Sequence, residues 1–126
     1  MIDVLLSIRP VWCRKIFRHE KLVELRKSSP RIAAPFRVYL YETKEGRGAV
    51  VGECTCWFVE KAVQRSYSPV ILESSCLSFE QINEYGKGKT VYGWYLAKVT
   101  EYKDLRPLSD FGVQRAPQSW CYVKAA

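Results

Sequence analysis

The sequence predicts an α+β fold, a small and mostly antiparallel β-barrel of about five to six strands with two flanking helices. Three observations lead to this fold class. The apolar segments follow the order strand, helix, strand, hairpin, helix, strand, loop, strand. Few residues separate the strands, whereas a parallel sheet needs crossovers of a dozen residues or more. The length of 126 residues suits one ordinary domain, so we expect a single domain over residues 1–126.

The first strand and the first helix are predicted within residues 2–20. Residues 2–8, IDVLLSI, are rich in branched apolar side chains and end before Arg9-Pro10, which cannot continue a central strand. Pro10 suits the first turn of a helix. In the segment VWCRKIFRHE the apolar and basic residues fall on opposite faces at helical spacing: Trp12, Cys13, Ile16 and Phe17 on one, Arg14, Lys15 and Arg18 on the other. We therefore expect a helix with one buried and one basic face.

The middle of the chain predicts three further strands. EKLVELRK (20–27) is the second strand, and SSPRIAAP with its two prolines is an irregular connection. RVYLYET (37–43) alternates apolar and polar residues, KEGRG is a turn, and AVVGECTCWFVE (49–60) completes a hairpin.

The last half of the chain predicts one helix and two strands. SFEQINEYG (78–86) has Ser78 as helix cap, Gln81 three residues later and Gly86 as a stop. VYGWYLAKVTEY (91–102) and SWCYVK (119–124) are the remaining strands. Residues 61–77 are ambiguous, and the pattern leaves open whether they cover a cleft as a lid or complete the barrel.

The net charge of +7 is concentrated in the first third of the chain. Residues 1–47 hold eleven Lys and Arg against five Asp and Glu, a balance of +6, while residues 48–126 hold nine against eight, a balance of +1. Clustered basic residues favour a phosphate-bearing partner, because binding to nucleic acid releases counterions. The alternative is a basic surface that serves only solubility.

Several classes of chemistry find no support. His19 is the only histidine and follows a basic helix, where the helix dipole explains it, so a histidine-based triad is not expected. Cys54 and Cys56 lack partners for a metal site, and no glycine-rich phosphate loop is present, so we expect no metal and no cofactor. The five cysteines show no disulfide framework, and no signal peptide or membrane span is visible. We expect a cytoplasmic protein with free, mostly buried thiols, no membrane contact and a monomeric state.

The strand EKLVELRK carries three charges among apolar residues. Side chains alternate along a strand, so Glu24 and Arg26 share a face with their α-carbons about 6.5–7 Å apart, close enough to pair. Lys21 has the other parity and joins them only if it lies in the turn that leads into the strand. The alternative is a Glu–Arg pair on an outward face with Lys21 in solvent.

These residues also carry a resemblance. VLLSIRPVWCRKIFRHEKLVELRK resembles the opening of the ASCH family, whose members have a strand ending in SIKP or SIRP, a helix with a KI core and a GxKxxExR-like motif. Here SIRP is residues 7–10, Lys15-Ile16 is the helix core, and Lys21, Glu24 and Arg26 are the motif. VVGE (50–53) and APQSWCYV (116–123) resemble later parts of small, stand-alone, prophage-type members.

The resemblance implies a PUA-like barrel and a cleft, bordered by the first helix and the KxxExR strand, that binds RNA, or DNA, or a modified nucleoside. The residues that it places at this nucleic-acid interface are Arg14, Lys15, Arg18, Lys21, Arg26, Lys27, Gln118 and Ser119. The sequence departs from the family at Glu20, which stands where relatives have a glycine before the motif lysine.

The resemblance also suggests an enzyme as the alternative. Some small relatives are amidohydrolases of acylated nucleosides that use a lysine, a threonine and a glutamate, and others have been assigned ribonuclease activity. Glu24 stands in the position of that threonine and cannot supply its hydroxyl. In an enzyme, Lys21 would be the base or electrostatic stabiliser, Glu24 the acid–base partner and Arg26 the substrate anchor. We rank nucleic-acid binding first, hydrolysis of RNA or of a modified nucleoside second, and a protein-interaction domain third.

Overall fold

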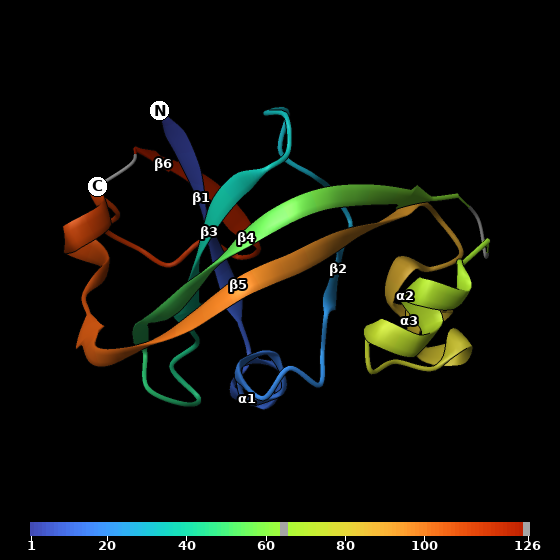
Figure 1. The fold of residues 1–126 in the computed structure, drawn as a ribbon, viewed down its shortest axis with the longest axis horizontal. Coiled ribbons are helices and arrows are strands. Elements are labelled where there is room, and N and C mark those ends of the chain that lie inside the picture. Colours follow the sequence, from blue (N-terminus) through green and yellow to red (C-terminus); the bar gives the residue numbers. More distant parts are fainter. Residues whose placement is uncertain (64–65, 125–126) are drawn as a thin grey trace.

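A single curved sheet of six strands organises the molecule (Figure 1). In this computed structural model, residues 1–63 and 66–124 are described. The strand order is β2-β5-β4-β3-β1-β6. The elements, in chain order, are β1 (Ile2–Ile8), α1 (Pro10–Phe17), β2 (Val23–Arg26), β3 (Phe36–Glu42), β4 (Ala49–Ala62), α2 (Pro69–Ser74), α3 (Phe79–Gly86), β5 (Val91–Arg106), the 3₁₀ turn η1 (Leu108–Phe111) and β6 (Trp120–Lys124).

The sheet is open, and the prediction of a closed barrel is wrong. β2 pairs only with β5 and β6 only with β1, so these two strands are edges. The expected second strand, residues 20–27, shrinks to the four residues of β2, and Leu22 ahead of it is 47% exposed. So short a strand offers few backbone groups with which to form a second ladder.

The pairing is mostly antiparallel, as expected, with one exception. β1 and β3 pair in parallel, with Val4 opposite Val38 and Ile8 opposite Glu42. The residues between β1 and β3, 9–35, contain α1 and β2 and are long enough for a crossover. The connection between β1 and β3 is therefore not short, and the expectation of antiparallel pairing does not hold for this one pair.

The predicted hairpin of β3 and β4 is confirmed, and β4 and β5 form a longer ribbon than expected. β4 runs to Ala62, and β5 runs for 16 residues to Arg106. Three irregularities in their pairing let the two strands bend, and Figure 1 shows them side by side across the molecule.

The ambiguous segment 61–77 contains an additional helix. Residues 64 and 65 lie outside the described residues, and α2 follows them, capped by Ser68, whose Oγ accepts the Ile71 N–H at 3.2 Å. The described residues therefore form three α-helices, where the sequence predicted two. The second predicted helix is confirmed as α3, with Ser78 as its cap. Gly86 remains helical, and Lys87 takes the left-handed conformation that ends the helix.

Each helix is attached to the sheet by a few buried side chains. α1 buries Cys13 and Ile16. At Gly52 of β4, a β-carbon would lie 2.7 Å from the Phe17 ring and 2.4 Å from the carbonyl oxygen of Thr100. The close approach of α1 to β4 therefore requires glycine at this position. At the other end, α2 and α3 bury Ile71 and Ile82 in one cluster with residues of β2 and β5. None of the described helices is long and apolar enough to cross a membrane.

Candidate functional site

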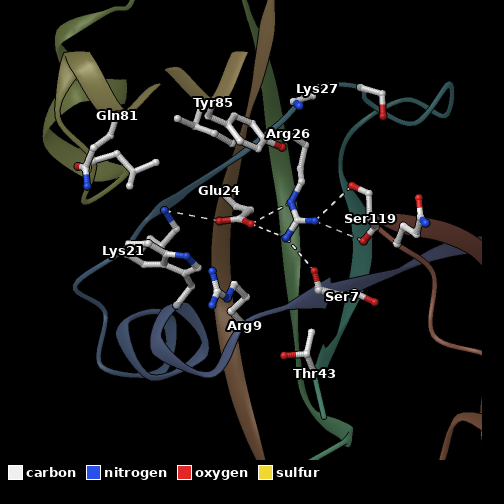
Figure 2. A pocket seen from close by; sticks show the side chains of 15 residues that line it. Ser7, Arg9, Lys21, Glu24, Arg26, Lys27, Thr43, Gln81, Tyr85 and Ser119 are labelled. Atoms are coloured by element: carbon white, nitrogen blue, oxygen red, sulfur yellow. Dashed lines mark hydrogen bonds and ion pairs between the residues drawn. The ribbon is translucent and has the colours of Figure 1, made fainter. Parts of the chain in front are cut away.

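A pocket of about 610 Å³ opens where α1, β2, α3 and the segment before β6 meet. It lies where the sheet stays open, between β2 and β1, which no backbone hydrogen-bond ladder joins. Figure 2 shows it with Glu24 near its centre. The lining residues are Ser7, Arg9, Trp12, Lys21, Glu24, Leu25, Arg26, Lys27, Ser28, Thr43, Leu77, Gln81, Tyr85, Gln118 and Ser119.

The turn between α1 and β2 directs Lys21 into the protein. His19 takes the left-handed conformation, with φ of 60°, and the N–H groups of Glu20 and Lys21 both donate to the carbonyl oxygen of Lys15, at 2.8 and 3.1 Å. His19 therefore takes the positive φ of this turn, and Glu20 does not adopt one. Lys21 therefore lies in the turn that leads into β2. The sequence required this position if Lys21 was to join Glu24 and Arg26.

Lys21 is buried to 2% exposure and has three kinds of partner. Its Nζ donates to the carbonyl oxygen of Ser75, lies 3.5 Å from Glu24 Oε1, and sits 4.8 Å from the centre of the Trp12 ring. Burial lowers the pKa of Lys21, and the attraction of Glu24 opposes this shift. The Lys21 ammonium group therefore loses hydration at this site.

Glu24 is the carboxylate between two cations. Its Oε1 faces Lys21, and its Oε2 accepts from Arg26 Nε at 2.9 Å and from Arg26 Nη2 at 2.6 Å. The side chains of Glu24 and Arg26 are only 7% and 12% exposed. Both carboxylate oxygens are therefore engaged inside the protein.

Arg26 links β2 to β1 and to the residue that precedes β6. Its Nη2 donates to the carbonyl oxygen of Ser7 at 2.7 Å, and its Nη1 reaches the carbonyl oxygen and Oγ of Ser119 at 3.4 and 3.2 Å. Figure 2 shows the guanidinium extended from β2 toward these two serines. Every nitrogen of the guanidinium thus has a partner within the protein, so side-chain bonds connect strands that no backbone ladder joins.

Two further cations stand at the rim of the pocket and are exposed. Arg9 Nη2 lies 3.1 Å from Glu45 Oε2, and Lys27 Nζ lies 4.9 Å from the centre of the Tyr85 ring. With Lys21 and Arg26 they make four cations in the lining, against the single carboxylate of Glu24. The formal charge of the lining is therefore +3.

The fold of this chain is similar to that of solved structures. The structure of ASCH from Zymomonas mobilis matches with a TM-score of 0.80 and 20% sequence identity, over 97% of this chain and 87% of that chain. This chain has the ASCH-domain fold. Two mutant forms of the Zymomonas mobilis ASCH protein match similarly, each with a TM-score of 0.79, 18% identity and 97% of this chain covered, over 90% and 88% of their own chains. No family model and no curated protein matches the sequence.

The ASCH fold brings together five of the eight residues predicted for a nucleic-acid interface. Lys21, Arg26, Lys27, Gln118 and Ser119 line the pocket. The three basic residues of α1 do not line it. Arg14 and Arg18 are exposed, and Lys15 is half-buried with its Nζ 3.9 Å from Glu20 Oε1.

Sequence reasoning missed several pocket residues of this ASCH fold. Gln81 and Tyr85 are four residues apart and lie on one face of α3, and Leu77 just precedes the helix cap. The helical spacing of Gln81 and Tyr85 was visible in the sequence, but only the cap of this helix was interpreted. Thr43 follows β3 and had no such signal, since its place depends on how β3 and β1 pair. The other missed lining residues are Ser7, Arg9, Trp12, Leu25 and Ser28.

No group of three or more His, Cys, Asp or Glu side chains suited to a metal ion occurs in residues 1–63 and 66–124 of this ASCH fold. The chemistry at hand in the pocket is that of cations, one engaged carboxylate, hydroxyl and amide groups, and two aromatic rings.

Proposed function

We propose that the protein binds RNA, with one nucleotide of a single strand held in the pocket. The observation that carries this proposal is the charge of the lining. Four cations face one carboxylate, and both oxygens of that carboxylate are already engaged by Lys21 and Arg26. An anionic ligand is therefore favoured over a neutral or cationic one.

The size and the walls of the pocket support a nucleotide. Its volume of about 610 Å³ lies within the range of small-molecule sites. Trp12 from α1 and Tyr85 from α3 line it, and aromatic rings are the usual platforms for the unstacked bases of single-stranded RNA.

Arg9 and Lys27 are the residues that we assign to phosphate contact. Both lie at the rim and are exposed, whereas each nitrogen of Arg26 already has a partner. Arg26 then acts by holding the pocket's walls together. The exposed Arg14 and Arg18 of α1 lie outside the lining and would add a longer-range attraction.

The test is the affinity for a fluorescent ten-nucleotide RNA of mixed sequence, measured by anisotropy over a series of salt concentrations. The double variant Arg9→Ala, Lys27→Ala should bind more weakly. Its salt slope should fall by about 1.4, which is two contacts at about 0.7 each. The matched control is Lys103→Ala, Arg115→Ala, which removes two exposed charges outside the pocket lining.

The outcomes separate the alternatives. Equal losses in the two double variants would reject the pocket as the RNA site, and absence of binding by the wild type would reject RNA binding. The triple variant Arg14→Ala, Lys15→Ala, Arg18→Ala reports whether α1 takes part, and DNA of the same sequence reports the choice between RNA and DNA.

A second candidate is hydrolysis of RNA or of an acylated nucleoside. The observation that favours it is Lys21, a pocket residue whose pKa burial lowers and whose Nζ lies 3.5 Å from Glu24. The test is turnover of acylated nucleosides and of single-stranded and structured RNA by the wild type, Lys21→Ala and Glu24→Gln. Turnover that survives both substitutions would exclude these residues from the mechanism.

A further inference from the structure

Three side chains form the wall of the pocket on the side of α3. Leu77 precedes the helix cap, and Gln81 and Tyr85, four residues apart, lie on one face of the helix. Figure 2 shows Gln81 and Tyr85 along the edge of the pocket, on the side away from Ser7 and Thr43. Gln81 and Tyr85 therefore both belong to the lining that a bound base would meet.

The orientation of the Gln81 amide is set by the start of the helix. The Ser78 N–H donates to Gln81 Oε1 at 2.8 Å, and the Gln81 N–H donates to Ser78 Oγ at 3.1 Å. This reciprocal capping box occupies the amide oxygen. No hydrogen bond of the amide nitrogen is found among residues 1–63 and 66–124, so the side chain offers free donors while its oxygen is already engaged by the Ser78 N–H.

The polar groups elsewhere in the pocket follow the same pattern. Four cations are donors only, and the Glu24 carboxylate is engaged on both oxygens. Ser7 Oγ donates to the carbonyl oxygen of Pro117 at 2.6 Å. Gln118, exposed on the opposite side, is the residue that can offer an amide oxygen. The charged groups of the pocket therefore offer donors, and the remaining acceptors are the hydroxyl groups and the Gln118 amide oxygen.

We propose that Gln81, held by its capping box, makes the pocket select keto bases over amino bases in single-stranded RNA. A free amide nitrogen donates to the carbonyl oxygen of uracil, hypoxanthine or guanine, whereas the amino group of cytosine or adenine meets another donor. This inference rests on the proposed RNA binding and adds a base preference to it.

The test uses two pairs of ten-nucleotide homopolymers, oligo(U) with oligo(C) and oligo(I) with oligo(A). Within each pair, one base has a carbonyl group where the other has an amino group. The wild type should bind the keto member at least about fivefold more tightly in both pairs, the lower end of the discrimination from a good base contact.

The deciding variant is Gln81→Glu. Glutamate three residues after a serine also forms a capping box, so the helix start is retained while the donor is replaced by a carboxylate oxygen. The keto-to-amino affinity ratio should fall below one in both pairs. A thermal midpoint equal to that of the wild type shows that the fold is intact.

The matched control is Gln118→Glu, which adds the same charge to the same pocket and leaves the α3 donor in place. It should weaken binding of all four oligonucleotides without changing the ratios.

Equal binding of keto and amino members by the wild type overturns the base selection but leaves RNA binding standing. A ratio that is unchanged in Gln81→Glu overturns the role of Gln81. Failure of the wild type to bind any of the four is instead a failure of the proposed function.

Discussion

The guanidinium of Arg26 donates to the main-chain carbonyl of Ser7 at 2.7 Å and so joins β2, one edge of the sheet, to β1 at the far side. The backbone leaves the sheet open between these strands. The same guanidinium holds Glu24, which in turn faces Lys21. The charged residues of β2 therefore fasten the curved sheet and at the same time form the floor of the candidate site.

Removal of Arg26 should destabilise the protein strongly. Arg26→Ala leaves the Glu24 carboxylate buried with one partner fewer and cuts the link to Ser7, and breaking a buried pair in this way costs about 3–5 kcal/mol. The measurement is the free energy of unfolding in urea. The control is Arg37→Ala, whose side chain is 52% exposed and 3.6 Å from Glu53, and which should cost less than about 1 kcal/mol. Similar losses in both variants would contradict a fastening role.

Lys21 should make stability depend on pH in the alkaline range. Burial lowers its pKa in the folded state below the ordinary value of 10.5. Between these two pKa values the unfolded chain binds the extra proton, so the contribution of Lys21 to the free energy of unfolding rises with pH. Relative to Lys21→Met, the wild type should therefore gain stability as the pH is raised from neutrality toward 10.5. Urea unfolding of both proteins at several pH values checks this, and parallel curves would contradict it.

Glu45 should weaken the binding of RNA. It pairs with Arg9 at the rim of the pocket, with both side chains more than half exposed, and so competes with a phosphate for that guanidinium. Glu45→Gln should raise the affinity for single-stranded RNA about two- to fivefold at low salt, the range that an exposed ion pair allows. The effect should fade at high salt. Glu53→Gln, which frees Arg37 away from this pocket, serves as the control, and an equal gain there would assign the effect to net charge alone.

The five cysteines should fall into two reactivity classes. Cys13, Cys54 and Cys56 are buried, and burial raises the pKa of Cys13 to about 12 and that of Cys56 to about 11. A buried thiol that stays protonated reacts slowly. A thiol reagent at pH 8 should therefore modify at most Cys76 and Cys121 quickly, and all five only after denaturation. Rapid reaction of three or more thiols in the native protein would contradict this packing.

Local patterns predicted most of the elements. The run of branched apolar residues at 2–8, the proline at the start of α1 and the Ser78–Gln81 cap of α3 depend on neighbouring residues, and the elements that they predicted are confirmed. The helix α2 was missed because six residues are too few for a helical period to be visible.

For the candidate site, the sequence by itself determined that Glu24 and Arg26 share a face, because strand alternation is a local property of the backbone. Only the tertiary structure decided that Lys21 joins them, since this depends on the left-handed turn at His19 and on the carbonyl of Ser75, 54 residues away. It likewise decided that the sheet stays open and that α3 supplies a wall of the pocket. These outcomes depend on contacts between segments distant in the chain, which a local sequence pattern does not encode.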